Sequence, residues 1–290
     1  MAAKTNGAKL EGRVAFGAPL RVGFVGAGKV ACSLARYLQA DAAIGQTGFC
    51  SRSAEHAREA AEFCDGCAYG SLAELAEFGQ AIFLTVPDGA IARVAEELAG
   101  CGVSLAGKIV AHCSGAIASD ALAACRNAGA YVASMHPLYA VSSRFGCWQE
   151  LERAWFSLEG DDVAVRTLEA LLDRLGNAHA RIDASDKPRY HAAAVMASNL
   201  VVGLYDMAAG ELARCGIDRD EAESALAALF LGNARHVASD GVEASLTGPA
   251  ARGDEATIAR HLDVLADDAG VASAYRVLTE RCRRIAARTR

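Results

Sequence analysis

The stretch RVGFVGAGKVACSLARYL, residues 21–38, indicates the fold class of this chain. An apolar run typical of a strand leads through a glycine-rich turn into a run typical of a helix, and Gly26, Gly28 and Ala31 fill a G-x-G-x-x-G/A pattern. Gly26 allows a tight turn, Gly28 lets a phosphate approach the backbone, and Ala31 lets the helix pack closely on the strand. Amides at the helix start would face that phosphate. The turn predicts a dinucleotide site, although any glycine-rich connection between a strand and a helix looks similar.

The position of this turn in the chain favours the dinucleotide interpretation. From residue 21 to about 183, short strand-like runs alternate with helical runs, beginning with the turn itself. Such alternation predicts β-α-β units around a parallel, largely buried sheet, and the glycine turn is the first β-α connection of that sheet. The expected fold class is α/β, with a Rossmann-type parallel sheet domain over residues 20–183. Residues 1–19 are expected to be a flexible leader.

The end of the second predicted strand indicates which dinucleotide is bound. An NAD site has an acidic residue about 20 positions beyond the glycines, but the run TGFC is followed here by Ser51, Arg52 and Ser53. Two hydroxyls and a guanidinium suit a 2'-phosphate, so NADP is the expected cofactor. The alternative is that Arg52 is a surface residue and that Ser53 only caps the next helix.

Other strand ends supply the rest of the predicted crevice, because ligands of open α/β sheets bind beyond the carboxyl ends of the strands. The segments TVPD (85–88), HCSGA (112–116) and SMHPL (134–138) lie at such ends. His136 precedes a proline and is held extended, either in the crevice as a substrate-binding residue or as a structural turn histidine. The predicted cofactor-binding residues are Gly26, Ala27, Gly28, Lys29, Val30, Ser51, Arg52, Ser53, Thr85, Val86, Pro87, Ser114 and Gly115.

After residue 183 the strand-like runs stop, and residues 184–290 are expected to form an all-α domain for substrate binding and dimerisation. Asp186 is a candidate N-cap, and Pro188 suits the first turn of a long helix that extends to about residue 215. This helix is apolar on nearly every side, so we expect other helices or a partner subunit to enclose it. Asn199 and Asp206 interrupt it too much for a membrane span.

A polar stripe on the long helix is the best candidate for a catalytic site. Lys187, His191 and Ser198 or Asn199 are spaced four and then seven or eight residues apart, which places them on one helix face. His191 is the predicted proton donor, with Lys187 orienting the substrate and Asn199 binding its polar end. The alternative is a structural stripe that binds loop carbonyls. The predicted substrate-binding residues are His136, Ser198 and Arg252, the last in LTGPAARGD (246–254), where Asp254 is expected to cap the next helix.

Composition narrows the range of partners and ligands. The 290-residue chain is 52% hydrophobic and carries a net charge of −6, which argues against the basic surface that nonspecific nucleic-acid binding needs. A cytoplasmic protein with a small-molecule substrate is expected, without nucleic-acid or membrane partners. Ten cysteines are scattered along the chain, mostly in apolar segments, and most of them are expected to be free core thiols. Cys64 and Cys67 have C-x-x-C spacing but no second ligand pair, so no metal site is expected.

Several motifs together resemble a known family. GFVGAGKVA is similar to the opening of pyrroline-5-carboxylate reductases, and the overall plan resembles ketopantoate reductase and the 6-phosphogluconate dehydrogenase group. More specifically, SRS, TVPD, HCSGA, HPL, KPRYHAAAVMASN and GPAARGD resemble, in this order, bacterial proteins that join a Rossmann-like NADP-binding domain to a helical domain of unknown function. The likeness covers almost all of residues 20–270, and it implies NADP and a homodimer formed through the helical domain.

One departure limits what the resemblance implies about chemistry. Related hydroxyacid dehydrogenases have a catalytic lysine followed by asparagine one helical turn later, whereas Lys187 is followed at that distance by His191. Two functions therefore remain: an NADP-dependent oxidoreductase acting on a small carbonyl or imine compound, or an NADP(H)-binding sensor without turnover. Only the stripe of Lys187, His191 and Asn199 separates them, because a sensor needs no proton donor.

Overall fold

The computed structural model describes residues 19–288 of the chain, so the predicted leader lies outside the described residues apart from Pro19. The chain divides into two compact units, with the division between Met196 and Ala197. The sequence placed this division after residue 183. The difference arises because the helix that follows residue 186 packs against the strands of the first unit through its first turns.

The first unit is built on one eight-stranded sheet with the order β3-β2-β1-β4-β5-β6-β7-β8. The chain therefore crosses over after β3, and β1 and β4 are neighbours at the centre, as a Rossmann-type fold requires. All pairs are parallel except β6 with β7. The predicted α/β fold class is confirmed. The strands are β1 (Leu20–Val25), β2 (Ile44–Cys50), β3 (Cys67–Ala68), β4 (Ala81–Leu84), β5 (Ile109–His112), β6 (Tyr131–Leu138), β7 (Trp155–Gly160) and β8 (His179–Arg181).

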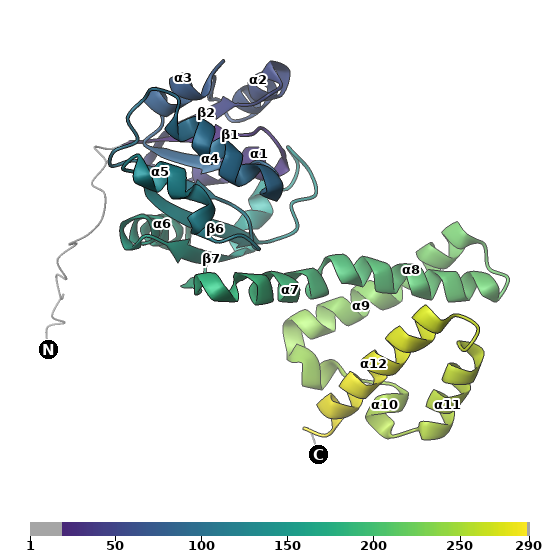
Figure 1. The fold of residues 1–290 in the computed structure, drawn as a ribbon. Coiled ribbons are helices and arrows are strands. Elements are labelled where there is room, and N and C mark those ends of the chain that lie inside the picture. Colours follow the sequence, from purple (N-terminus) through teal and green to yellow (C-terminus); the bar gives the residue numbers. More distant parts are fainter. Residues whose placement is uncertain (1–18, 289–290) are drawn as a thin grey trace, which may run out of the picture. The chain divides into compact units, whose positions relative to one another are not determined.

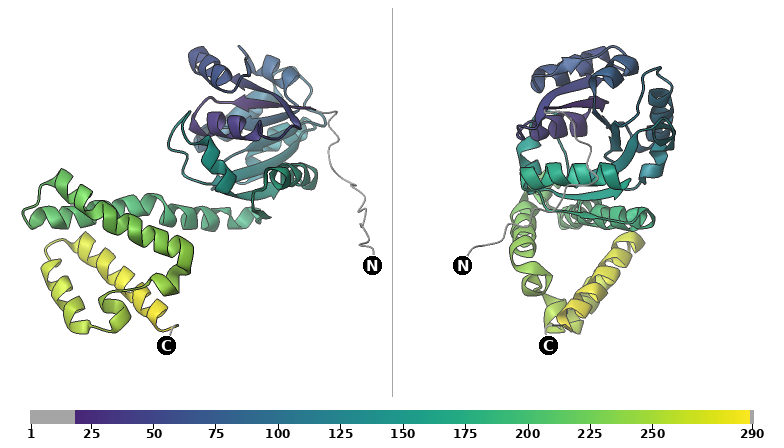
Figure 2. Two further views of the ribbon diagram at one scale, coloured as in Figure 1. Left: turned by 180° about the vertical axis from the view of Figure 1, so that it is seen from behind. Right: turned by 90° about the vertical axis from the view of Figure 1, so that its left-hand side faces the viewer.

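Helices cover both faces of this sheet (Figure 1, Figure 2). Successive residues of a strand point to opposite faces, so Phe24 enters one apolar cluster and Val25 the other. In the first cluster, Phe24 stacks between Phe49 and Phe83 of the neighbouring strands, with ring centroids 5.4 and 5.5 Å apart. The helices are α1 (Lys29–Leu38), α2 (Ala54–Phe63), α3 (Leu72–Phe78), α4 (Ile91–Ala99), α5 (Ala123–Asn127) and α6 (Asp162–Leu175), with 3-10 turns η1 (Asp88–Ala90), η2 (Ser119–Leu122), η3 (Trp148–Arg153) and η4 (Ala184–Asp186).

The sheet differs from the expected pattern in two places. The pair of β6 and β7 is antiparallel, with Leu138 opposite Trp155, because the chain between them forms η3 against α1 and does not cross to the other end of the sheet. The short strand β3 and helix α3 were not expected from the sequence. Ser71 starts α3, since its hydroxyl accepts a hydrogen bond from the amide of Glu74 at 3.2 Å.

The single long helix predicted from residue 188 to about 215 is wrong, because two helices replace it. Ser198 has φ −126° and ψ −82°, which interrupts the helix between α7 (Lys187–Ala197) and α8 (Asn199–Arg214). The prediction that Asp254 caps a helix is confirmed, since its Oδ1 accepts a hydrogen bond from the amide of Thr257 at 3.1 Å. The other helices of the second unit are α9 (Arg219–Ser245), α10 (Pro249–Arg252), α11 (Glu255–Val264) and α12 (Ala269–Ala286).

Apolar side chains of the second unit are unusually exposed. Leu200 and Val202 of α8 are 57% and 71% exposed, and Leu229 of α9 is 71% exposed. By length and composition alone, residues 184–214 would be long and apolar enough to cross a membrane, since an 18-residue window within them has a mean hydropathy of 1.4. That criterion is weak for a single helix, and this segment contains Lys187, which is buried in the first unit. Contiguous exposed apolar surface of this kind is typical of protein–protein interaction sites.

Candidate functional site

The two glycines of the first turn are required for different reasons. Gly26 has φ +107°, and a Cβ on it would lie 2.8 Å from the carbonyl oxygen of Thr85, so the fold itself excludes a side chain there. Gly28 has φ −84°, which any residue can adopt, and a Cβ on it would meet no protein atom within 4 Å. The space beside Gly28 is therefore open to a ligand. Ala31 is fully buried against the core, as the predicted close packing of helix on strand requires.

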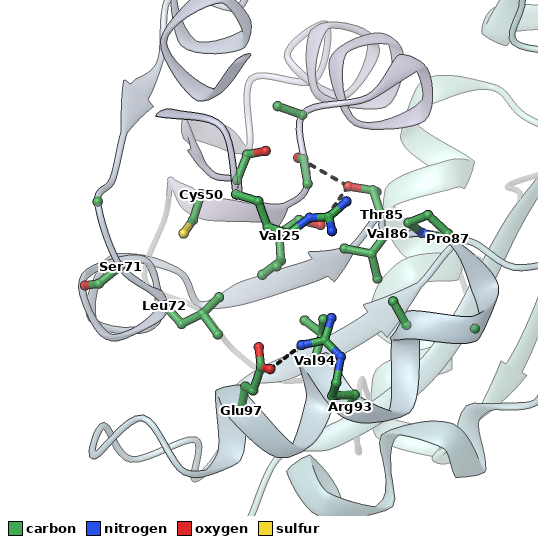
Figure 3. A pocket seen from close by; sticks show the side chains of 17 residues that line it. Val25, Cys50, Ser71, Leu72, Thr85, Val86, Pro87, Arg93, Val94 and Glu97 are labelled. Carbon is green, nitrogen blue, oxygen red and sulfur yellow. Dashed lines mark hydrogen bonds and ion pairs between the residues drawn. The ribbon is translucent and has the colours of Figure 1, made fainter. Parts of the chain in front are cut away.

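A cavity of about 590 Å³ opens beside this turn, at the carboxyl ends of β1, β2 and β4 (Figure 3). This is the edge of the sheet at which the strand order reverses and where open α/β sheets bind their ligands. Seven of the predicted cofactor-binding residues line the cavity: Gly26, Ala27, Ser51, Arg52, Thr85, Val86 and Pro87.

The other predicted cofactor-binding residues do not line this cavity. Gly28, Lys29 and Val30 form the start of α1, and Gly28 and Lys29 are exposed. The hydroxyl of Ser53 accepts a hydrogen bond from the amide of His56 at 3.2 Å and caps α2. This is the alternative role considered for Ser53, and it leaves the neighbouring Ser51 hydroxyl and Arg52 guanidinium to face the cavity.

Two charged residues of the cavity, Arg93 and Glu97, were not predicted from the sequence. Arg93 and Glu97 extend from α4 into the cavity and form an ion pair with each other (Figure 3). With Arg52, the charged side chains of the lining are two guanidiniums and one carboxylate, so the cavity has a surplus of one positive charge. Its position in the sequence could have indicated Arg93, because Arg93 lies in the first turn of the helix that follows the TVPD segment at the end of β4.

Ser114 connects the loops after β4 and β5. Its Oγ donates to Oδ2 of Asp88 at 2.9 Å and accepts hydrogen bonds from the amides of Ala116 and Ile117 at 3.2 and 3.1 Å. Asp88 directly follows Pro87 of the cavity lining. The Ser114 hydroxyl is therefore occupied within the protein, and it holds the loop that carries Gly115 next to the cavity.

Lys187 is buried beside the carboxyl end of β5 and the middle of β6, with only 1% of its surface exposed. Its Nζ donates to the carbonyl oxygen of Ser114 at 2.9 Å and to Oγ of Ser134 at 2.6 Å. Burial lowers the pKa of Lys187 below its usual value, while Glu159 and Asp88 oppose that shift. Two of its three donor positions hold the first turn of α7 against the sheet.

His191, one turn further along α7, lies beside Gly115 and His136. A Cβ on Gly115 would lie 2.8 Å from Nδ1 of His191 and 2.9 Å from Nε2 of His136, so both rings approach the same point. The Nδ1 atom of His191 is buried and has no hydrogen-bond partner within the described protein. An unpartnered buried ring nitrogen is unusual and indicates a place where a ligand or water completes the site.

His136 bonds to a second aromatic residue of α7. Its Nδ1 lies 2.8 Å from the hydroxyl of Tyr190, and the two rings meet edge to face. Burial, together with the charge of Lys187 and the neighbouring His191, lowers the pKa of His136 to about 4. His136 is therefore neutral at physiological pH. Sequence reasoning placed His136 near the crevice but did not find Tyr190, because a tyrosine on an apolar helix has the pattern of a core residue.

The remaining predicted substrate residues belong to the second unit. Ser198, Asn199 and Arg252 are exposed there. The helical spacing that predicts Asn199 on one face with Lys187 and His191 is interrupted, because Ser198 has a non-helical backbone between α7 and α8. Lys187 and His191 remain one turn apart on α7.

The cysteines give no sign of a redox or metal centre. All ten are free thiols, as expected, and half of them are buried. Burial raises the pKa of Cys64 to about 12, which keeps this thiol protonated. Within residues 19–288, no three His, Cys, Asp or Glu side chains are grouped in a way that could hold a metal ion.

The sheet order, the glycine turn and the cavity define a Rossmann-type protein, and family comparison agrees. Residues 9–137 match a Rossmann-like domain, and residues 154–282 match a domain of unknown function (DUF2520). The chain thus joins these two domains, which confirms the resemblance inferred from its motifs. No curated protein matches the chain in sequence at a significant level.

Solved structures with the same fold include NADP-dependent reductases. Protein TM1727 from Thermotoga maritima is 26% identical, with a TM-score of 0.71 over 92% of this chain and 99% of that one. A Bacteroides fragilis protein described as a "putative NADP oxidoreductase" is 23% identical, with a TM-score of 0.70 over 91% and 98%. A Plasmodium falciparum pyrroline carboxylate reductase with NADP bound is 14% identical, with a TM-score of 0.60 over 93% and 100%.

Proposed function

We propose that this protein is an NADP-dependent oxidoreductase that transfers a hydride to or from a small carbonyl or imine compound. The observation that carries the proposal is the cavity at the carboxyl ends of β1, β2 and β4, which joins the Gly26 turn to Arg52. NADP bound to a reductase of the same fold in Plasmodium falciparum supports the choice of cofactor.

The residues present fit the parts of NADP. Beside the open space at Gly28, amides at the start of α1 and the positive end of the helix dipole suit the pyrophosphate. Ser51 and Arg52 suit the 2'-phosphate, because a guanidinium forms charge-assisted hydrogen bonds with phosphate oxygens. Thr85, Val86 and Pro87, with the neighbouring Ser114 loop, would hold the nicotinamide end. The bound cofactor supplies or accepts the hydride.

The role of proton donor falls to His191. When a hydride reaches a carbonyl or imine carbon, the heteroatom gains negative charge and needs a proton from a group within hydrogen-bond distance. His191 offers a buried ring nitrogen without a protein partner, and a histidine side chain can transfer a proton to a reacting atom within hydrogen-bond distance. Lys187, with two hydrogen bonds to Ser114 and Ser134, acts in this proposal by positioning the Gly115 loop. Contacts of Ser198, Asn199 and Arg252 with substrate remain a prediction.

The test is NADPH oxidation with a panel of small aldehydes, ketones and cyclic imines, followed by variants of the donor. His191→Ala should lower turnover by about two to four orders of magnitude while the dissociation constant for NADPH stays within about twofold. The matched control is His179→Ala, because His179 lies on β8, where it pairs with Asp173. Equal turnover in wild type and His191→Ala would contradict the assignment.

The alternative is a sensor that binds NADP(H) without turnover. The hydrogen bonds of Lys187 to Ser114 and Ser134 are structural, which suits a sensor because a sensor needs no proton donor. His191 is then the main candidate for a donor if the protein is an enzyme. Tight NADPH binding combined with no oxidation by any member of the panel would favour the sensor.

We also propose a homodimer formed through the helical domain. The support is the exposed apolar surface of that unit, which includes Leu200, Val202 and Leu229. Burying such side chains against a second copy removes them from water, and symmetric dimers are the commonest way for a soluble protein to do so. Light scattering should show twice the mass of one chain at micromolar concentration. A monomer under these conditions would contradict the dimer.

A further inference from the structure

Tyr190 connects α7 to the sheet through a hydrogen bond with His136. The distance between the Tyr190 hydroxyl and Nδ1 of His136 is 2.8 Å. Tyr190 comes from α7 and His136 from β6, 54 residues earlier in the chain, so the bond depends on the tertiary fold. The ring of Tyr190 also packs at a tilt on Trp155 of β7, with centroids 6.2 Å apart. The hydroxyl is therefore held in place by the packing of its own ring.

The direction of this hydrogen bond follows from the chemistry of the two groups. Burial raises the pKa of Tyr190, so its hydroxyl keeps a proton to donate. His136 is neutral, and a neutral imidazole has one nitrogen with a lone pair and one with a proton. A phenol is a stronger donor than a neutral imidazole N–H, so the hydroxyl donates to Nδ1. The proton of His136 must then be on Nε2.

The Nε2 atom that carries this proton lies close to the unpartnered nitrogen of His191, beside Gly115. Nε2 of His136 and Nδ1 of His191 lie within 2.9 Å of the point that a Cβ of Gly115 would occupy. The absent side chain at Gly115 is what allows both rings to approach. A substrate heteroatom between the two rings could accept a hydrogen bond from one and receive a proton from the other.

We propose that Tyr190 is a positioning residue that fixes His136 as the Nε2–H tautomer, so that His136 donates a hydrogen bond to the reacting heteroatom while His191 transfers the proton. This division of roles rests on the proposed function of the same site. It assigns His136 to stabilising the developing negative charge on an oxygen or nitrogen, as a neutral donor that keeps its proton throughout the reaction. The substrate class is then a carbonyl or imine whose heteroatom has a free lone pair.

The charges around His136 are consistent with a neutral ring. Lys187, His191 and His112 disfavour a positive charge on His136, and Asp88 favours one. Lys187 lies on α7, His112 ends β5, and Asp88 starts η1. The three groups that oppose protonation come from two different elements, so no single loop movement would reverse the balance.

The test is nitrogen NMR of histidine rings in the full-length protein labelled with ¹⁵N-histidine, with the His136 signals assigned through His136→Gln. In wild type, His136 should show a protonated Nε2 and an unprotonated Nδ1, with no titration above about pH 5. Tyr190→Phe keeps the aromatic packing but removes the donor, so the ratio of the two tautomers should change by about tenfold. The matched control is Tyr205→Phe, whose hydroxyl donates to the carbonyl oxygen of Glu223 in the other unit.

A second measurement tests donation to a ligand. Acetate added to the NADP⁺ complex serves as the probe, because its oxygens accept hydrogen bonds. The Nε2 resonance of His136 should shift with acetate in wild type and Tyr205→Phe, and at least several-fold less in Tyr190→Phe. An unmoved Nε2 resonance in wild type would overturn the donor role of His136.

Two further outcomes separate this inference from the proposed function. A wild-type His136 with the proton on Nδ1, or a tautomer ratio unchanged in Tyr190→Phe, would overturn the role of Tyr190 even if NADPH binds and turns over. An Nε2–H tautomer that depends on Tyr190, in a protein that binds no NADPH in a fluorescence titration, would uphold the hydrogen bond and refute the function.

Discussion

The glycine turn offers a substitution that separates ligand binding from folding. In Gly28→Ala, the new Cβ would meet no protein atom within 4 Å, and φ of −84° suits alanine. Alanine is a poorer helix N-cap than glycine by up to about 1 kcal/mol. It also restricts the unfolded chain, which stabilises the fold by about 0.4–1 kcal/mol. We therefore expect the free energy of unfolding to change by no more than about 0.5 kcal/mol.

The same substitution should weaken NADPH binding. The new Cβ at position 28 would occupy the open space in which the pyrophosphate is proposed to approach the backbone. The loss of one charge-assisted hydrogen bond from an amide to a phosphate oxygen costs about 1.5–3 kcal/mol, which is a factor of about 10 to 100 in the dissociation constant. Fluorescence titration with NADPH measures this loss directly.

Gly26→Ala is the matched control, because there the fold and not the ligand excludes the side chain. A Cβ on Gly26 would lie 2.8 Å from the carbonyl oxygen of Thr85, at a φ of +107°. We expect a destabilisation of about 3 kcal/mol. Urea unfolding followed by tryptophan fluorescence reports on the first unit, since both tryptophans, Trp148 and Trp155, lie there. Unchanged NADPH affinity in Gly28→Ala, with a stable fold, would refute the placement of a phosphate at this turn.

Three further outcomes are expected. Arg52→Ala should remove the preference for NADPH over NADH, about 1.4 kcal/mol or tenfold, in paired titrations, and a preserved preference would contradict the role of Arg52. Arg93→Ala should weaken NADPH binding by about threefold to tenfold, and Glu97→Gln should strengthen it, because Glu97 competes with the cofactor phosphates for Arg93. Calorimetry that shows tighter binding in Arg93→Ala or weaker binding in Glu97→Gln would contradict this competition. The pKa of His136 is lowered to about 4, so as the pH falls below about 6.5 the histidine is protonated in the unfolded chain before it is protonated in the folded chain. The free energy of unfolding should therefore fall by about 2 kcal/mol between pH 7 and pH 5 because of His136. Urea unfolding of His136→Gln should not show this loss.

The fold was largely predictable because its signals are local. Strand-like and helical runs alternate along the first unit, and each run predicted as a strand corresponds to an observed strand, although β3 and α3 were not predicted. β3 has only two residues, too few for a periodic pattern, and α3 follows it directly. The break at Ser198 was missed because nothing in an apolar helical run marks a serine as non-helical.

The cavity at the glycine turn was more predictable than the surroundings of Lys187, His191 and Tyr190. Gly26, Ser51 and Arg52 lie at strand ends, and the topology of a parallel sheet brings strand ends to one edge. The hydrogen bonds of Lys187 and Tyr190 reach across 73 and 54 residues of sequence, so no spacing rule could give them. The polar stripe correctly indicated that Lys187 and His191 lie on one helix, α7. The placement of Asn199 on the same stripe assumed a continuous helix, which Ser198 interrupts.

We propose that the cavity at the glycine turn binds NADP(H) with selectivity for the 2'-phosphate. Isothermal titration of the wild-type protein with NADPH and with NADH, under identical buffer and salt, measures this selectivity. We expect one NADPH to bind per chain, at least tenfold more tightly than NADH, through the contact of Arg52 with the 2'-phosphate. Equal affinities for the two cofactors, or no binding of either, would contradict it.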